Sequence, residues 1–466
     1  MRLPLRAFAC SLLLLAARPL PAAELSADAR AAIDAKVAEV LKDTGAPAAS
    51  LAVVKDGAIA YAKAYGAARL GPPPLAATTS MRFSIGSISK QFTAAALLLL
   101  AEEGKVSLDD RVVRWLPGLT RAKDVTVRQL LSMTSGYQDF WPQDYVMPPM
   151  LKPVTAAEIL DGWAKKPLDF EPGTKWQYSN TNYVAAGAIV EKAAGRPLLD
   201  FLRARVFSPL GMTSVTDTDA APLGPSDPAG YLRYAVGPAR PAPKEGKGWM
   251  FAAGELAMTP ADLARWDVSL LDGTVLSPAS TRELTRDVLL ASGAGTHYGL
   301  GVAVAVVDGR RIVSHGGEVS GFTATNEVYP DDRAAICVFV NLDASDASAV
   351  IAKKVREILF ASAGDGREEA TAQARRIFEG LQKGVLDRTL FTENANAYFS
   401  EEALRDFASS LKPLGAPKTF TQSSQRLRGG MTQRRFKIEC GKRTLTLTTY
   451  TMPDGKLEQY MVAAAE

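Results

Sequence analysis

The sequence predicts a mixed α/β protein of the α+β type, in which an antiparallel sheet is flanked by helices and interrupted by an inserted all-helical subdomain. Strand-like patterns occupy both ends of residues 24–362, whereas the signals between about 106 and 245 are helical or loop-like and rich in proline. Residues 363–369 then read as a linker to residues 370–466, where a helical pattern precedes four strand-like runs. We therefore expect a large α+β domain followed by a small one.

The first 23 residues have the pattern of a secretory signal peptide. Arg2 and Arg6 precede a leucine-rich run, and small residues follow it. The apolar run is shorter than the roughly 20 residues that a membrane-spanning helix needs. We expect cleavage close to Ala23, a secreted or periplasmic location, and no stable membrane insertion afterwards. The alternative is an N-terminal anchor that stays attached.

The large domain is expected to build one sheet from both of its ends. Its predicted elements are, in order, a helix over residues 26–43, a β-hairpin over residues 49–66 that turns at Asp56-Gly57, a long apolar helix after Ser87, strands over residues 298–343 and a helix near residues 346–362. A cleft between this sheet and the inserted helices would be a natural place for a site.

The C-terminal domain shows a second helix-then-strands pattern. Its helical stripe consists of Ala370, Ala374, Ile377, Phe378 and Leu381, and its strand-like runs start near Lys418, Met431, Arg443 and Lys456. This order resembles the small accessory domains of the nuclear-transport-factor-2-like type. The strands are rich in Arg and Lys, which indicates either a solvated sheet face or a surface for an anionic ligand.

Composition excludes several classes of protein. The formal net charge is +4, and three unopposed arginines lie in the first 23 residues, so the remainder is near +1. This balance argues against nucleic acid or an anionic membrane as a general partner. Only Cys337 and Cys440 follow the leader, so no disulfide framework is expected. The two histidines, His297 and His315, are poor zinc ligands without a Cys pair, and we expect no metal and no cofactor.

Two Ser-x-x-Lys matches occur, and their positions distinguish them. Ser87 and Lys90 stand at the start of an apolar helix, where free N–H groups and the helix dipole favour negative charge. Lys90 could take the Ser87 proton only if burial lowers its pKa. The second match, Ser409 to Lys412, lies at the end of a predicted helix. Ser409 would therefore face the negative end of the helix dipole, which disfavours negative charge. On this stretch alone, Ser87 could equally be an N-cap and Lys90 a surface lysine.

Two further motifs favour a catalytic interpretation. Tyr178-Ser179-Asn180 is a Tyr-x-Asn motif, and His315-Gly316-Gly317 has the form cation-x-Gly on a strand. Together with Ser87 and Lys90, in this order, they resemble the signature of the serine β-lactamase and penicillin-binding protein superfamily. The chain resembles its class C branch, with the esterases and D-aminopeptidases that share the fold. The resemblance extends over nearly all of residues 26–362 and implies the β-lactamase/transpeptidase-like fold.

The resemblance also implies roles for individual residues. Ser87 would be acylated, while Lys90 and Tyr178 would share the proton transfers, with the Tyr178 pKa lowered by Lys90. Asn180 would hold a substrate amide or orient Lys90. The remaining implied substrate-binding residues are His315 at the sheet edge, Gly317, which would let the substrate approach closely, and Glu318, whose N–H would be the second oxyanion donor.

Departures from the family pattern bear on the substrate. Many relatives have Lys-Thr-Gly where this chain has His315-Gly316-Gly317, which favours esterases and D-aminopeptidases over strong β-lactamases. A neutral histidine could donate one hydrogen bond but would lack a permanent charge. Met133 stands where relatives often have His, and no role is assigned to it. The aromatic residues of the segment 136–153 could either rim an acyl pocket or cap the helical subdomain.

The predicted function is therefore an exported serine hydrolase acting on esters or on amides and peptides that contain D-amino acids. A β-lactamase or a D-alanyl-D-alanine carboxypeptidase is the alternative within the superfamily. An alternative of another class is a penicillin-binding sensor that is acylated without turnover. A Ser-His-Asp hydrolase is disfavoured because no Gly-x-Ser-x-Gly elbow occurs. The expected partner is a small-molecule or peptide substrate, and the oligomeric state stays open.

Overall fold

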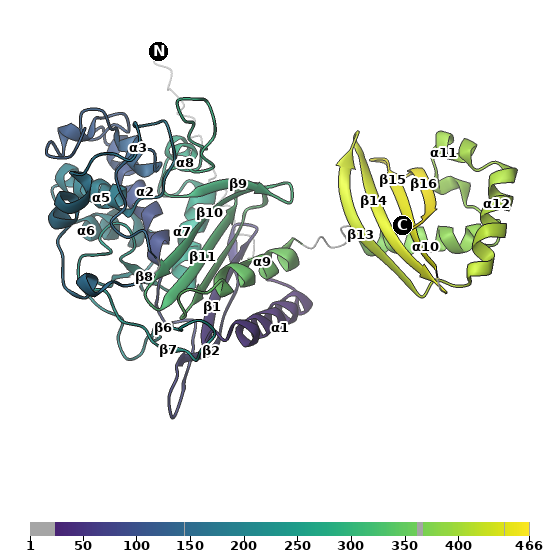
Figure 1. Ribbon diagram of the computed structural model, residues 1–466, viewed down its shortest axis with the longest axis horizontal. Coiled ribbons are helices and arrows are strands. Elements are labelled where there is room, and N and C mark those ends of the chain that lie inside the picture. Colours follow the sequence, from purple (N-terminus) through teal and green to yellow (C-terminus); the bar gives the residue numbers. More distant parts are fainter. Residues whose placement is uncertain (1–23, 144, 361–366, 442, 466) are drawn as a thin grey trace, which may run out of the picture. The chain divides into compact units, whose positions relative to one another are not determined.

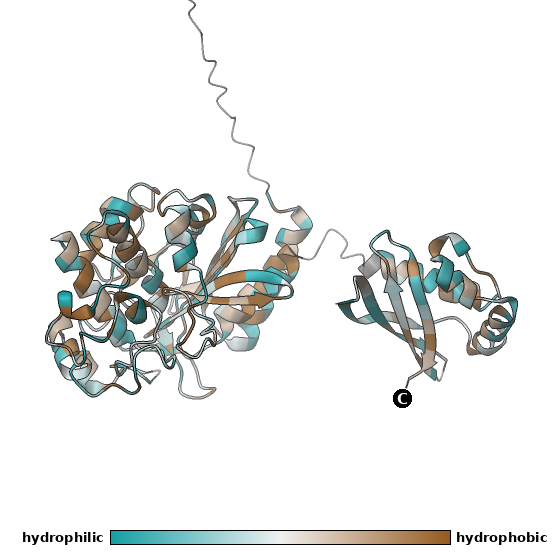
Figure 2. Cartoon of the chain, turned by 90° about the horizontal axis from the view of Figure 1, so that it is seen from above, coloured by the Kyte–Doolittle hydropathy of each residue, from teal (hydrophilic) through white to brown (hydrophobic). Residues whose placement is uncertain are grey.

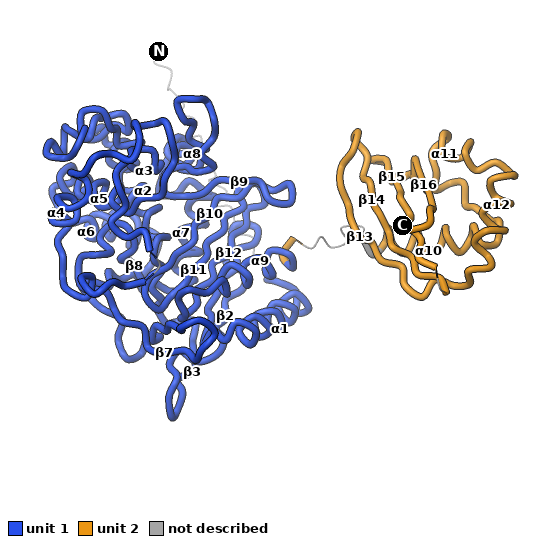
Figure 3. The backbone as a smooth tube through the Cα atoms, viewed as in Figure 1, with its two compact units in different colours: residues 1–358 blue, residues 359–466 orange. Residues whose placement is uncertain are grey.

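The computed structural model describes residues 24–143, 145–360, 367–441 and 443–465. The expected signal peptide (residues 1–23) and residues 363–366 of the expected linker lie outside the described residues. The chain divides into two compact units, with the boundary between Ile358 and Leu359 (Figure 3). Each unit has its own hydrophobic core.

Unit 1 contains one seven-stranded antiparallel sheet, in which strands from both ends of the unit meet. In spatial order its strands are β3 (Leu75–Ala76), β2 (Ala58–Arg69), β1 (Ala48–Lys55), β12 (Ala334–Val340), β11 (Phe322–Tyr329), β10 (Arg310–Val319) and β9 (Ala303–Val307). The N-terminal and C-terminal halves join where β1 pairs with β12, with Ala49 opposite Val340. The expectation of a sheet built from both ends is therefore confirmed.

The first hairpin turns where its sequence requires. Asp56 and Gly57 both have positive φ, 53° and 78°. Two successive residues of this kind match the twist of the flanking strands and favour a two-residue hairpin. The turn thereby fixes the register of β1 against β2.

Helices cover both faces of the sheet (Figure 1). The helices α1 (Ala27–Thr44) and α9 (Ala347–Leu359) lie on one side, and α7 (Pro260–Asp272) packs against β1, β2 and β12 from the other. As a result β1 is buried along almost its whole length. A strand covered on both faces needs a continuous apolar run, which its sequence AASLAVVK supplies.

The helical part of unit 1 lies between β2 and β9 in the sequence and packs around α2 (Lys90–Glu102), whose apolar residues are buried all round. Its α-helices are α3 (Val127–Leu131), α4 (Ala156–Ile159), α5 (Asn180–Ala194), α6 (Leu198–Leu202) and α8 (Pro278–Leu284). Its shorter helical turns are η1 (Gly86–Ser89), η2 (Val112–Arg114), η3 (Pro148–Leu151), and the π-helical η4 (Leu160–Ala164) and η5 (Arg203–Phe207). The 3-10 turn η6 (Pro330–Asp332) lies between β11 and β12.

The inserted segment is not entirely helical, contrary to the expectation from the sequence. Short strands also occur there and nearby: β4 (Phe83–Ser84), β5 (Thr216–Asp217), β6 (Tyr231–Leu232), β7 (Arg240–Pro241) and β8 (Leu256–Met258). They form one three-stranded and one two-stranded sheet. Strands of two or three residues are too short to show the period-two alternation from which strands are predicted.

Unit 2 is a four-stranded antiparallel sheet with helices against it. Its elements are α10 (Arg367–Leu381), α11 (Glu393–Tyr398), α12 (Glu401–Leu411), the 3-10 turns η7 (Arg388–Leu390) and η8 (Lys412–Leu414), β13 (Thr419–Arg428), β14 (Met431–Cys440), β15 (Arg443–Thr451) and β16 (Leu457–Ala464). Helix α10 begins at Arg367, inside the stretch expected to be a linker, because Arg, Glu and Ala are good helix formers. The core joins Phe378 of α10 to Phe436 and Leu447 of the sheet.

Figure 2 shows hydrophobic and hydrophilic residues alternating along the outer helices of both units. This is the pattern of helices that bury one face and leave the other in water. Among the described residues, none of the helices combines the length and the apolar composition needed to cross a bilayer.

Candidate active site

Ser87 and Lys90 are positioned by the connection from β4 through η1 to α2. Ser87 lies in the 3-10 turn η1, and Lys90 is the first residue of α2. The helix start expected around Ser87 is therefore present, although its first turn is 3-10 rather than α. The carbonyl of Ser87 accepts the N–H of Lys90, which carries both side chains to the same side of the turn.

The Lys90 ammonium group is fully buried and surrounded by oxygen atoms. Its Nζ lies 2.8 Å from Ser87 Oγ, 2.8 Å from Asn180 Oδ1 and 2.8 Å from the Ala253 carbonyl oxygen. Burial lowers the pKa of Lys90 to about 7, and the nearby Asp139 carboxylate opposes this shift. A substantial fraction of Lys90 is therefore neutral near physiological pH, as a base toward Ser87 must be.

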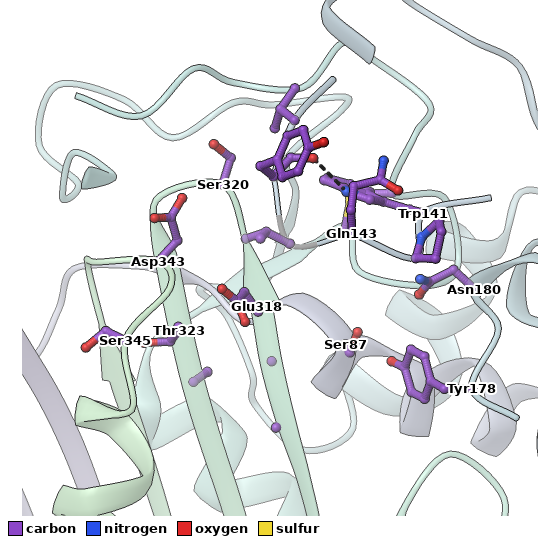
Figure 4. Close-up of a pocket in the computed structure, with 18 of the residues that line it drawn as sticks. Ser87, Trp141, Gln143, Tyr178, Asn180, Glu318, Ser320, Thr323, Asp343 and Ser345 are labelled. Atoms are coloured by element: carbon purple, nitrogen blue, oxygen red, sulfur yellow. Dashed lines mark hydrogen bonds between the residues drawn. The ribbon is translucent and has the colours of Figure 1, made fainter. Parts of the chain in front are cut away.

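Tyr178 and Asn180 approach from the start of α5. Asn180 is the first residue of that helix, and Tyr178 lies two residues before it with its hydroxyl directed toward Ser87 (Figure 4). Burial raises the pKa of Tyr178, while a hydrogen bond with Ser87 partly opposes the rise. The expected lowering of this pKa by Lys90 is thus wrong, because desolvation of the phenolate outweighs the other effects. The Tyr178 phenol is therefore protonated at neutral pH.

His315 on β10 is neutral and engaged on both sides of its ring. Its Nδ1 lies 2.5 Å from the Gly316 carbonyl oxygen, which can only accept, so Nδ1 carries the hydrogen. Its Nε2 then accepts from the Tyr298 hydroxyl at 2.9 Å. Burial and the Lys90 charge lower the pKa of His315 to about 4. The Gly316 carbonyl thus takes the single N–H of the neutral ring, and a hydrogen bond from His315 to a substrate, which stays a prediction, would require the ring to leave this partner.

The sequence did not predict Tyr298 as a residue of the site. It precedes β9, and it reaches His315 only because β9 folds back onto β10. Nothing in the residues around Tyr298 distinguishes it from a core aromatic, and burial raises its pKa, so it stays protonated.

Gly317 and Glu318 bring the edge of the sheet against η1. A Cβ on Gly317 would lie 1.9 Å from the Ile85 carbonyl oxygen, so this glycine is required by the contact between β10 and the start of η1. Close approach of a substrate at Gly317 stays a prediction, and the structure adds close approach of the backbone as a reason for this glycine. A Cβ on Gly86 would lie 2.6 Å from the Glu318 amide nitrogen, so this amide lies beside the residue that precedes Ser87.

Asp139 is a second site residue that the sequence did not reveal. It lies between α3 and η3, among the aromatic residues of the segment 136–153, and its carboxylate accepts hydrogen bonds from the backbone of Trp141 and from Asn180. Burial raises the pKa of Asp139 despite these bonds. An acidic residue in a proline-rich loop carries no periodic signal, so only the fold discloses its position.

A cavity of about 1100 Å³ opens above Ser87. Among the aromatic residues of the segment 136–153, Trp141 and Tyr145 line the cavity, as residues at the rim of a pocket would. Tyr137 and Phe140 are instead buried in the hydrophobic core. The described residues that line the cavity include no Lys or Arg. They do include three carboxylates and further aromatic rings, which are Asp139, Glu318, Asp343, Trp176, Tyr178 and Tyr234. Figure 4 shows Tyr178, Glu318 and Asp343 among them.

One group of carboxylates within the described residues lies close enough to share a metal ion. It consists of Asp217, Asp219 and Glu255, whose ligand atoms lie within 4.8 Å of one another. None of the three lines the cavity. Burial, followed by the Asp217 charge, raises the pKa of Glu255 well above its usual range, so the folded protein favours the protonated form of Glu255.

A serine that contacts a buried lysine of lowered pKa, beside a tyrosine and an asparagine on a mixed α/β fold, defines a serine hydrolase with the β-lactamase fold. The chain belongs to the Beta-lactamase family, whose model matches residues 33–359.

Similar proteins carry the names of penicillin-binding proteins and of enzymes acting on D-amino acids. The chain is 29% identical to penicillin-binding protein 4* of Bacillus subtilis, over 74% of this chain and 78% of that protein. It is 30% identical to a D-aminopeptidase of Brucella anthropi, over 64% of this chain. The match spans only 56% of that D-aminopeptidase.

Solved structures agree with this family. The D-amino acid amidase from Ochrobactrum anthropi SV3, complexed with L-phenylalanine amide, has a TM-score of 0.63 and 27% identity, covering 72% of this chain and 98% of that one. The octameric penicillin-binding protein homologue from Pyrococcus abyssi has a TM-score of 0.64 at 20% identity, covering 93% and 99%. The second likeness concerns the fold alone.

Proposed function

We propose that this protein is an exported serine hydrolase that cleaves esters, or amides and peptides that contain D-amino acids, through an acyl-enzyme on Ser87. The observation that carries the proposal is the 2.8 Å contact between Ser87 Oγ and the buried Lys90 Nζ. The lowered pKa of Lys90, about 7, makes the neutral amine available as a base.

In the first half-reaction, Lys90 takes the proton of the Ser87 hydroxyl while Oγ forms a bond to the substrate carbonyl carbon. The negative charge that develops on the carbonyl oxygen would be held by the N–H groups of Ser87 and Glu318. Collapse of this intermediate breaks the bond to the leaving group, which receives a proton from Tyr178. Lys90 returns its proton to Tyr178, and the neutral lysine is available again.

In the second half-reaction, water attacks the acyl carbon and transfers its proton to the Lys90–Tyr178 pair. The bond between the acyl carbon and Ser87 Oγ breaks, and Oγ regains a proton. Asn180, whose Oδ1 accepts from Lys90, keeps the lysine directed at Ser87 throughout.

The charges around the cavity support a substrate with an amino group and no required carboxylate. The lining residues include Asp139, Glu318 and Asp343 but no Lys or Arg among the described residues, and His315 is neutral. A substrate carboxylate would lack a charged partner, whereas an ammonium group would meet a favourable potential. The names D-aminopeptidase and D-amino acid amidase among the relatives agree with this preference.

We also propose the domain limits and the location expected from the sequence. Residues 1–23 direct export to the periplasm or the medium, and residues 24–362 form the hydrolase with its insertion at about 106–245. The expected linker over residues 363–369 is shortened to residues 363–366, because the accessory domain begins with α10 at Arg367 instead of at residue 370.

A substrate panel tests the function. The mature protein is given a short-chain nitrophenyl ester, D-alanyl nitroanilide, its L-enantiomer, its N-acetylated form and a chromogenic cephalosporin. We expect turnover of the ester and of D-alanyl nitroanilide, with weaker turnover after N-acetylation and for the L-enantiomer. Preferred turnover of the cephalosporin would establish the β-lactamase alternative. A burst of one equivalent without steady turnover on every substrate would establish the penicillin-binding sensor.

A further inference from the structure

The two oxygens of Asp139 are both committed to the segment that carries Asn180. Oδ1 accepts the backbone N–H of Asn180 at 2.9 Å and that of Trp141 at 3.2 Å. Oδ2 accepts from the Asn180 side-chain nitrogen, Nδ2, at 3.3 Å. One carboxylate therefore holds both the backbone and the side chain of Asn180.

The side-chain amide of Asn180 has two ends that are nearly equal in shape but opposite in hydrogen bonding. In the observed orientation, Nδ2 faces the Asp139 carboxylate and Oδ1 faces Lys90 Nζ at 2.8 Å. A rotation of the amide by half a turn would set Oδ1 against the carboxylate and Nδ2 against the lysine. A carboxylate can only accept and an ammonium can only donate, so both contacts would become repulsive.

We propose that Asp139 is a positioning residue for the reaction proposed above: by fixing the orientation of the Asn180 amide, it keeps an acceptor oxygen on Lys90 and so keeps Lys90 directed at Ser87. The inference rests on the proposed function, because it assigns Asp139 to the Lys90-dependent acylation of Ser87. Asp139 has no direct contact with Ser87 in this assignment and acts through Asn180.

Replacing the Asp139 carboxylate by an amide, in Asp139→Asn, removes both the orientation and the charge. The introduced amide could donate to Asn180 Oδ1, so the rotated form of Asn180 would no longer be excluded. Lys90 would then face Nδ2 and lose one of its acceptors. Loss of an acceptor lowers the pKa of Lys90. Loss of the nearby negative charge lowers it as well, since the Asp139 charge supports the protonated form of Lys90.

The other groups around Lys90 do not replace this charge. Ser87 and Asn180 are neutral partners on η1 and α5, and Tyr178 and Tyr183 place their rings 5.0 Å and 5.6 Å from Nζ. The pKa values of both tyrosines are raised, so both are neutral. On β10, His315 is neutral as well. The proton affinity of Lys90 should therefore fall in Asp139→Asn.

The test measures labelling of Ser87 by a fluorophosphonate probe against pH, with the full chain. This readout needs no substrate, so it is independent of turnover. We expect Asp139→Asn to slow labelling about 10- to 100-fold at the optimum, as a misdirected catalytic group does, and to move the acid limb of the profile to lower pH. Asp139→Glu should restore part of the rate. The matched control is Asp43→Asn, at an exposed residue of α1, which should leave both rate and profile unchanged.

A double-mutant cycle separates positioning from general damage to the fold. In an Asn180→Ala background the amide is gone, so Asp139→Asn should add little further loss of rate. Equal losses in both backgrounds would overturn the positioning role, and so would an unchanged rate and profile in Asp139→Asn. If the unmutated protein is labelled but hydrolyses nothing in the panel, the proposed function fails while the cycle still decides the role of Asp139. If Ser87 is not labelled at all, both are overturned.

Discussion

The carbonyl oxygen of Ile85 occupies the space into which a side chain on Gly317 would project, since a Cβ there would lie 1.9 Å from that oxygen. At the neighbouring Gly316, the nearest atom to such a Cβ is the Ala324 carbonyl oxygen at 4.0 Å. We predict that Gly317→Ala separates β10 from η1 and lowers kcat/KM at least about 100-fold, because the nucleophile and the Glu318 amide lose their alignment. Gly316→Ala should change kcat/KM far less. Equal effects of the two alanines would contradict this account of the contact.

Ser87, and not Ser409, should be the residue that reacts. A fluorophosphonate probe or penicillin should label Ser87, as peptide mass spectrometry would show, and Ser87→Ala should lose at least about a thousandfold in kcat. The Ser409 hydroxyl donates to the Asp406 carbonyl near the end of α12, so Ser409→Ala serves as the control and should retain full activity. Near-normal activity of Ser87→Ala would remove the acyl-enzyme mechanism.

Lys90 should set the acid limb of the pH–rate profile. Its pKa is lowered to about 7, and only the neutral amine accepts the Ser87 proton, so kcat/KM should rise with pH through this value and level off above it. Lys90→Ala and Tyr178→Phe should each cost nearly as much as both together, because the two residues act as a unit. Additive losses in the double variant would show that they act separately.

His315→Lys should shift the substrate preference toward molecules with a carboxylate. With its pKa lowered to about 4, His315 is uncharged at neutral pH, and a lysine would supply a charged hydrogen bond of roughly 1 to 3 kcal/mol. We expect the ratio of kcat/KM for a cephalosporin to that for a nitrophenyl ester to be higher in His315→Lys than in the unmutated protein at every pH from about 6 to about 8. Because histidine is neutral over this whole range, the shift should not be confined to pH values above 7. An unmutated protein that hydrolyses a cephalosporin efficiently and leaves esters untouched would refute this reading of His315.

The buried carboxyl of Asp267 should make stability depend on pH. Asp267 is fully buried in α7; its Oδ2 accepts from Asn326 and Cys337, and its Oδ1 has no hydrogen-bond partner among the described residues. Burial raises the pKa of Asp267 from 3.8 to about 7, so the folded state favours the protonated acid. Its contribution to stability is present below the unfolded pKa and is lost as the pH rises toward 7.

Asp267→Asn mimics the protonated form. At about pH 8 it should raise the free energy of unfolding by about 2 to 4 kcal/mol relative to the unmutated protein, and the difference should shrink as the pH falls toward 4. Urea unfolding at several pH values measures this, with Asp43→Asn as the exposed control. A difference that does not vary with pH would show that Asp267 is not the titrating group.

The elements with strong local patterns could be predicted from the sequence, and so could the residues of the three motifs. The hairpin at Asp56-Gly57 and the strand beginning at Met431 were found because turn residues and alternation are local properties. Asp139 and Tyr298 were missed because their roles depend on contacts between segments far apart in the chain. The direction of the Tyr178 pKa shift was also missed, because it depends on how completely the hydroxyl is removed from water.

The environment of Lys90 has a consequence for the catalytic cycle that follows from counting hydrogens. An ammonium group offers three hydrogens and a free amine only two, and Lys90 Nζ faces three oxygens. In the resting protein, three acceptors match the three hydrogens of the charged lysine and favour the charged form, whereas burial disfavours the charged form. In the proposed mechanism, acylation of Ser87 would turn its Oγ into an ester oxygen, which is a weak acceptor, and the charged lysine would be left with two good partners. The acyl-enzyme is therefore the state in which Lys90 releases its proton most readily, so that the covalent state of the serine and the charge of the lysine change together.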